Sequence, residues 1–288
     1  MDAVAKLGYR PNPIARSMRS DRSGMIALLV PDLINEYYAV SAEVIHRELT
    51  HAGYQLIITS AASAEEEQRT FQWLEAYRVD GIIHVPVDPT QSLPQHTPIV
   101  QINRVSAQQI AAVLANEIAA FEDLTRTILD FGHRDIAMIS GEEQHSSTRQ
   151  RLQGVRNALE NRNDVRIRVR NGQFTEEWGF EAAMGMLTDL PDVVIASGPR
   201  IASGVISALQ EHNVGVPEDV SIVSFGDPEW FSLWQPGVAS VSPPLEEMAQ
   251  RAVAKLMQLI SAEESDTPAI EYFPCTFVAR GSLARRTG

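Results

Sequence analysis

Short, continuously apolar runs alternate with longer segments whose apolar residues recur at helical spacing, and this alternation limits the possible folds most. Strands are predicted at residues 25–30, 54–59, 81–85, 98–102, 135–140, 165–169, 193–196, 221–225 and 270–277. Helices are predicted at residues 40–52, 65–77, 118–131, 148–160, 175–188, 201–212 and 244–260. Strands that are apolar along their whole length are buried on both faces, which favours parallel sheets covered by helices.

This pattern runs through two halves of similar size. It therefore predicts an α/β protein with two doubly wound parallel sheets. Open parallel sheets bind ligands outside the carboxyl ends of their strands. Two facing halves would thus bind a small molecule in the cleft between them.

Composition excludes several classes of protein. The 288 residues are 44% hydrophobic, enough for a sizeable core, and the single cysteine, Cys275, cannot form an internal disulfide or a C-x-x-C motif. No stretch approaches the roughly 18–20 apolar residues of a membrane helix. The N-terminal residues lack the apolar segment of a signal peptide. We therefore expect a soluble cytoplasmic protein.

The net charge of −13 is unevenly distributed. Residues 1–23 sum to +3, whereas the rest of the chain sums to −16. A DNA-binding segment is usually basic. A short basic arm on an acidic body is therefore compatible with nucleic-acid binding by the arm alone.

No catalytic arrangement is recognisable in the sequence. The phosphate-binding, dinucleotide-binding and nucleophile-elbow glycine motifs are absent, and the seven histidines are scattered without metal-ligand spacing. The acidic run at residues 65–67 is explained by the first turn of a helix. We expect no enzyme activity, no metal and no cofactor, so a binding function is favoured.

Several segments occur in an order and spacing that point to one family. They are residues 7–12 (LGYRPN), 15–19 (ARSMR), 26–32 (IALLVPD), 79–83 (VDGII), 131–136 (FGHRDI), 151–159 (RLQGVRNAL), 216–225 (VPEDVSIVSF) and 277–282 (FVARGS). Together they resemble the lactose-repressor/galactose-repressor (LacI/GalR) family of transcription regulators over nearly the whole chain. The resemblance implies a type I periplasmic-binding-protein-like core and a homodimer that reads a pseudo-palindromic operator.

The family also implies a division of the chain. Residues 1–23 would be the end of a helix-turn-helix domain and a hinge. Residues 24–131 with 243–270 would form the N-terminal effector-binding subdomain, and residues 132–242 with 271–288 the C-terminal one. Three crossovers are expected, near residues 131–132, 240–244 and 270–272.

Members of the family begin with a helix-turn-helix domain, and the resemblance implies that only its last helix, residues 2–7, remains in this sequence. We expect the chain to be a fragment or a misplaced start of a full repressor, and the alternative is a natural protein that lost this domain; the intact hinge favours the first. In a full regulator Arg10, Arg16, Arg19 and Arg22 would contact phosphates. Met18 would insert into the minor groove, and Asn12 belongs to the same hinge. We expect this chain alone to bind operator poorly.

Five candidate effector-binding residues follow from the resemblance. Tyr37 and Tyr38 lie in the loop after the first strand, where the family places aromatic residues. Arg151 matches the arginine that contacts the effector, and a guanidinium can bind hydroxyls or a carboxylate in bidentate fashion. Phe174 matches an aromatic that stacks on a sugar or base, and Leu245 an apolar position at a crossover.

The sequence also departs from the family where sugar hydroxyls are usually bound. An Asn-Asp pair is replaced by residues 197–200 (SGPR), and an Asp-Asn pair by residues 116–117 (NE). Gly226 stands where a first aspartate is usual, which leaves Asp227. An unpartnered buried hydroxyl costs about 1–3 kcal/mol, so these departures disfavour a typical hexose as the effector. The alternatives are a different ligand or a pocket that is no longer used. Arg200 is a candidate new cationic contact.

The sequence favours one of three hypotheses. The first is a ligand-responsive regulator, with repression the expected sense, whose partners are a sugar or related metabolite, operator DNA in the full-length protein, and a second copy. The second is a free-standing small-molecule-binding protein, which shares the fold. Such a protein would need a signal peptide and would not carry the hinge pattern. An enzyme on the same scaffold would need a nucleophile, metal set or phosphate loop.

Overall fold

The computed structural model describes residues 22–106, 110–261 and 270–286. It contains two six-stranded sheets with the orders β11-β5-β4-β3-β1-β2 and β12-β10-β9-β8-β6-β7. All strand pairs are parallel except β10 with β12. The predicted α/β class with two doubly wound sheets is confirmed.

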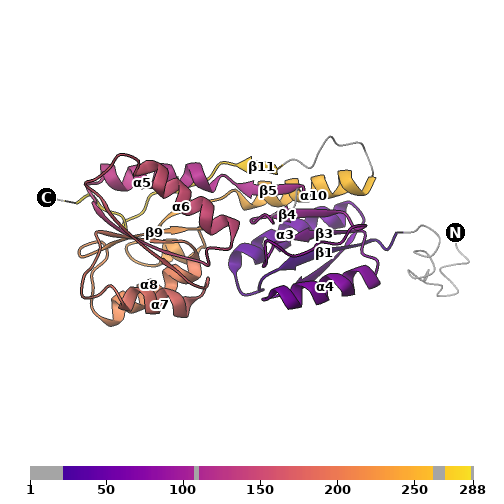
Figure 1. Cartoon of the computed structure of the whole chain (residues 1–288), viewed down its shortest axis with the longest axis horizontal. Helices are drawn as coiled ribbons and strands as arrows, with labels where there is room; N and C mark the ends of the chain where they lie inside the picture. Colours follow the sequence, from indigo (N-terminus) through magenta and orange to yellow (C-terminus); the bar gives the residue numbers. More distant parts are fainter. Residues whose placement is uncertain (1–21, 107–109, 262–269, 287–288) are drawn as a thin grey trace, which may run out of the picture.

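The first sheet consists of β1 (Met25–Val30), β2 (Gln55–Ser60), β3 (Gly81–His84), β4 (Ile99–Ile102), β5 (Ala112–Ala115) and β11 (Ile270–Phe273). Its helices are α3 (Glu36–His51), α4 (Ala64–Ala76) and α10 (Leu245–Ser261), and α3 packs against α10 on one side of the sheet (Figure 1). Strand β1 shows why its sequence is apolar throughout. Ile26 and Leu28 belong to one core cluster, and Ala27 and Leu29 to another.

The second sheet consists of β6 (Asp135–Ser140), β7 (Arg166–Asn171), β8 (Val193–Ala196), β9 (Ser221–Phe225), β10 (Ala239–Ser242) and β12 (Thr276–Val278). Its helices are α5 (Glu117–Asp130), α6 (Ser146–Ala158), α7 (Glu176–Met184), α8 (Pro199–Glu211) and the short α9 (Trp230–Leu233). Helix α5 packs against α6, and α7 against α8 (Figure 1). The two units lie side by side along the length of the molecule.

The chain passes between the units three times. The first passage is at Asn116, between β5 and α5, and lies earlier than the expected residues 131–132 because α5 packs on α6 rather than on the first sheet. The second lies between β10 and α10, as expected. The third is at residues 274–275, where the predicted single strand 270–277 is wrong. It is two strands in different sheets, separated at Pro274, which has no N–H to donate to a ladder.

The subdomain boundaries stay a proposal. Strand pairing favours ending the two segments of the first subdomain near residues 115 and 273 rather than 131 and 270. The hinge residues Arg10, Asn12, Arg16, Met18 and Arg19 lie outside the described residues. No helix within the described ranges is long and apolar enough to cross a membrane.

Candidate functional site

A cavity lies between the two units, at the carboxyl ends of strands from both sheets. Its volume is about 710 Å³, including its opening to solvent. The first unit contributes residues from the start of α3 and the end of β4, and the second contributes residues from α6 and the ends of β8 and β9. The side chains used below are Tyr37, Tyr38, Asn103, Arg104, Ser147, Arg151, Phe174, Ser197, Asp227 and Leu245.

Both predicted tyrosines line the cavity, but they lie in the first turn of α3 and not in the preceding loop. Asn35 caps this helix by accepting a hydrogen bond from the Tyr37 N–H, so the helix begins before the apolar periodicity does. The rings make an edge-to-face contact at 5.6 Å. Burial raises the pKa of Tyr37 and of Tyr38, so both hydroxyls stay protonated at neutral pH.

Arg151 is held from several sides. Its Nε and Nη2 each lie 2.9 Å from an oxygen of Glu117, and Nη1 donates to the Ser197 carbonyl. The guanidinium carbon lies 3.9 Å from the centroid of the Phe225 ring. Both members of the ion pair are buried, at 4% and 2% exposure. Glu117 is one of the two residues that replace the usual Asp-Asn pair, so the departure in sequence supplies the partner of the expected effector arginine.

Phe174 comes directly before α7 and covers one wall of the cavity. Its ring lies against Gly141, where an added Cβ would overlap the ring. The guanidinium carbon of Arg104 lies 5.2 Å from the ring centroid, and the His145 ring centroid lies 6.1 Å away. The guanidinium carbon of Arg151 lies 5.8 Å from the same centroid, so the Phe174 ring packs on Gly141 and also contacts an arginine from each unit.

Arg104 differs from Arg151 and Asp227 because it has no oppositely charged partner among the described residues. Its side chain is 7% exposed. Nη1 makes two long contacts, to the Pro86 carbonyl at 3.4 Å and to His145 Nδ1 at 3.5 Å. Nε has no hydrogen-bond partner, and no carboxylate of the described residues forms an ion pair with Arg104. Buried charges are normally paired, so this one needs an explanation.

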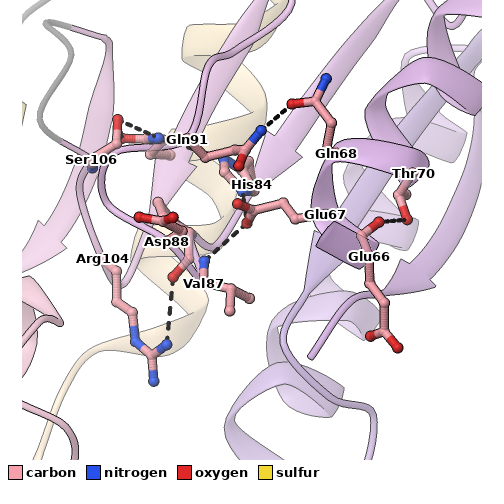
Figure 2. A network of polar contacts seen from close by, with 12 residues as sticks. Glu66, Glu67, Gln68, Thr70, His84, Val87, Asp88, Gln91, Arg104 and Ser106 are labelled. Atoms are coloured by element: carbon pink, nitrogen blue, oxygen red, sulfur yellow. Dashed lines mark hydrogen bonds and ion pairs between the residues drawn. The ribbon is translucent and has the colours of Figure 1, made fainter. Parts of the chain in front are cut away.

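A buried polar network fixes the segment that carries Arg104 (Figure 2). Gln101 Oε1 accepts the Ser106 N–H at 3.0 Å, which closes the loop around Arg104. Beneath it, His84 Nε2 and the Val87 N–H lie 2.8 and 2.9 Å from the same oxygen of Glu67. The direction of Arg104 is thus set by the protein before any ligand binds.

The same segment connects the two units. The Val105 N–H donates to Ser146 Oγ at 3.0 Å, and Arg104 contacts His145, the residue before α6. Burial and then the charge of Arg104 lower the pKa of His145 to about 3, so its imidazole is neutral. A neutral ring can donate from Nε2 to Glu142, 3.2 Å away, while Nδ1 accepts from Arg104.

Asp227 lines the cavity, but its charge is already compensated. Arg280 approaches both its oxygens, at 2.5 and 3.1 Å, and Ser240 Oγ donates to it at 2.8 Å. Gly226 before it has a φ of +84°, and an added Cβ would approach Pro199 to 3.0 Å. The usual aspartate would therefore be strained at this position.

Leu245 and Arg200 differ in their placement. Leu245, the first residue of α10, lines the cavity as expected. Arg200, in the first turn of α8, is not among the lining residues and lies near Glu177, whose pKa is lowered by backbone and Thr175 hydrogen bonds and then by Arg200. The extra cation of the cavity is therefore Arg104 and not Arg200.

Further polar atoms around the cavity are buried without a partner within the described part of the chain. They are Tyr37 Oη, Asn103 Oδ1 and Ser197 Oγ. Each unpartnered buried polar group costs about 1–3 kcal/mol. Such groups in one cavity are typical of a binding site whose ligand supplies the missing partners. The described residues hold no cluster of three or more His, Cys, Asp or Glu side chains that could bind a metal ion.

Comparisons with known proteins agree with this architecture. The model of the periplasmic binding protein-like domain family matches residues 125–283. A solved structure described as a LacI-family transcription regulation repressor from Corynebacterium glutamicum is 34% identical, with a TM-score of 0.83 over 91% of this chain and 99% of that one. The chain belongs to the LacI/GalR family of transcription regulators.

Two further relatives extend the comparison with the LacI/GalR family. Catabolite control protein A of Priestia megaterium is 26% identical over 94% of this chain and 85% of its own length. The structure of the Cra dual regulator from Pseudomonas putida, solved in complex with fructose 1-phosphate, is 21% identical with a TM-score of 0.80 over 89% of this chain and 99% of its own, and this similarity shows the fold.

The sequence did not identify Asn103, Arg104, Ser147 or the Glu117–Arg151 pair as parts of the site. A signal for the first two existed, because they directly follow a predicted strand, and open parallel sheets bind ligands outside the carboxyl ends of their strands. Glu117 and Arg151 are 34 positions apart in the sequence. Arg104 stands out only because the folded chain places no carboxylate of the described residues beside it. Neither is visible as a motif.

Proposed function

We propose that this chain is the ligand-sensing core of a DNA-binding transcription regulator, with repression the expected sense, and that its effector binds in the cavity between the two units. The observation that carries this proposal is the buried guanidinium of Arg104, which has no carboxylate partner among the described residues. A protein keeps such a charge in its interior at a cost, which a ligand of opposite charge would offset. The effector would therefore be anionic.

The remaining walls suit a hydroxylated ligand body. Tyr37 Oη, Asn103 Oδ1 and Ser197 Oγ are free to exchange hydrogen bonds with hydroxyl groups. The rings of Tyr38 and Phe174 offer apolar faces to the C–H surface of a sugar-like molecule. Small hydroxylated anions, such as sugar acids or sugar phosphates, fit both features better than neutral hexoses do.

The position of the cavity supplies a mechanism for regulation. Arg104 and Tyr37 belong to the first unit and Arg151 and Phe174 to the second, so one ligand would contact both. A ligand that binds one relative arrangement of the units more tightly shifts the population towards it. The shift would reach DNA through the hinge that precedes the first unit, and such a regulator would act in the cytoplasm.

A homodimer is part of the proposal. Strand β2 is an edge of the first sheet, and apolar side chains are exposed on it and on the neighbouring segment around α3, namely Leu33, Ile34, Val40 and Ile58. An exposed apolar patch beside an open sheet edge is typical of a surface that binds another chain. A second copy would cover it and bring two hinges together.

A thermal-shift screen tests effector binding. The probes are sugar acids of four to six carbons, the alditols of the same lengths and their phosphate esters. A ligand that binds the native state alone raises the melting temperature with concentration. We expect acids or phosphates to stabilise the protein and alditols not to. Equal shifts with alditols, or no shift with any anion, would contradict an anionic effector.

A further inference from the structure

We infer that Glu117 determines how many negative charges the cavity accepts. By neutralising Arg151, it leaves Arg104 as the single uncompensated buried cation among the lining residues that the structure describes, and so selects a hydroxylated monocarboxylate over a phosphate monoester. This inference rests on the proposed function, since it specifies the ligand of the same cavity.

The charges around the cavity can be assigned individually. Arg151 is compensated by Glu117, and Asp227 by Arg280, each through two contacts of an arginine with a carboxylate. Glu36 lies at the exposed start of α3. Arg104 is the remaining charged lining side chain, and no carboxylate of the described segments pairs with it. The buried part of the wall therefore carries one net positive charge towards a ligand.

The geometry keeps Arg151 from turning towards a ligand as a free cation. Glu117 occupies Nε and Nη2, Ser197 O accepts from Nη1, and the guanidinium rests on the Phe225 ring. Of the five N–H donors of an arginine, three are used. The other two can still donate to a neutral acceptor such as a hydroxyl, but the charge is already balanced.

Charge count then separates the two classes of anion. A carboxylate carries one negative charge, whereas a phosphate monoester carries about −1.5 to −2 at pH 7. One arginine compensates the first. The second would leave additional charge buried without a partner, which is unfavourable in a site removed from water. Glu117 is the first residue of α5, where the helix N-terminus also favours a negative side chain. The residue that neutralises Arg151 therefore lies where the chain first passes between the units.

The experiment compares wild type with Glu117→Gln and the double variant Glu117→Gln/Arg151→Met. The first variant leaves two uncompensated cations and the second leaves one, as in wild type. The probes are inorganic phosphate and formate, which are small enough to enter whatever the shape of the natural ligand, followed by gluconate and glucitol 6-phosphate. Affinities are obtained from the concentration dependence of the melting temperature.

We expect Glu117→Gln to raise the ratio of phosphate to carboxylate affinity by about tenfold or more, since a second charge acts at short range in a partly buried site. The double variant should return the ratio to that of wild type. An unchanged ratio in Glu117→Gln, or a raised ratio in the double variant, would overturn the role of Glu117. If Glu117→Gln does not fold, the double variant still tests the inference. A ratio of phosphate to carboxylate affinity that differs from that of wild type would refute the argument from charge.

Failure of the proposed function gives a different result. If no anion binds this cavity at all, wild type and every variant respond equally to both probes, and substitution of Arg104 has no effect on the response. If anions bind but Glu117 does not select among them, the response depends on Arg104 and the ratio does not depend on Glu117. The two failures are therefore distinguishable.

Discussion

Replacing Arg104 by methionine should make the ligand-free protein more stable while removing its response to anions. Arg104 is 7% exposed, its Nε has no partner, and its two hydrogen bonds are long, at 3.4 and 3.5 Å. Methionine has a similar length, no charge and a flexible side chain that fills irregular space. The substitution thus removes a buried charge without leaving a large void.

Opposing contributions decide the size of the effect. Leaving a charge buried without a counterion costs several kcal/mol, even after relaxation of the surroundings. Against this, the substitution loses a cation–π contact with Phe174 at 5.2 Å, worth about 1–2 kcal/mol, and two weak hydrogen bonds of about 0.5 kcal/mol each. The expected net change is a gain of about 1–2 kcal/mol in the free energy of unfolding.

Urea or thermal unfolding of the ligand-free proteins measures this change, with Arg126→Met as the control because Arg126 is an exposed helix residue. A gain of 1 kcal/mol should raise the melting temperature by about 2–4 °C in a chain of this size. The control should change stability by less than about 0.5 kcal/mol. A loss of 2 kcal/mol or more in Arg104→Met would show that Arg104 is a satisfied structural residue, and the reasoning from its isolation would be refuted.

Two further predictions concern other parts of the molecule. Because the pKa of His145 is lowered to about 3, its neutral form stabilises the protein above about pH 6.5, and this contribution is lost by up to ~1.4 kcal/mol per pH unit as the pH falls. Unfolding of His145→Gln between pH 7 and 5 should show a smaller loss than wild type, and an equal loss would contradict the prediction. Gly141→Ala should displace the Phe174 ring and lower effector affinity by about tenfold or more. Ala137→Gly in β6, the strand that Gly141 directly follows, should change affinity little. Calorimetry measures both, and unchanged affinity in Gly141→Ala would be evidence against Phe174 as a ligand contact.

Much of the fold follows from the sequence because its central strands are apolar on both faces. Two strands escaped prediction. β5 begins and ends with alanine, which favours helices as well, and β10 alternates serine with small apolar residues, so neither gives a clear strand signal. The predicted last strand failed at Pro274, where the chain leaves one sheet for the other. That change of partner depends on the arrangement of whole units and not on local preference.

The candidate site was partly predictable for a related reason. Tyr37, Arg151 and Phe174 line the cavity as predicted. They could be predicted because segments of similar sequence in one family occupy the same place in the fold. Arg104 has no distinguishing motif, and its significance lies in the absence of a counterion, which is a property of the folded surroundings. Glu117 was noticed as a departure from the family, but its contact with Arg151 could not be inferred from residues on two different helices.

Calorimetric titration of wild type and Arg104→Met with the sugar acid that gives the largest thermal shift, and with its matching alditol, tests the central claim most directly. We expect wild type to bind one acid per chain and to bind the alditol at least about 30-fold more weakly, because a buried charge pair would be missing. Arg104→Met should lose a similar factor for the acid and little for the alditol. Equal acid affinity in wild type and Arg104→Met would contradict the claim that this cavity is built around an anionic effector.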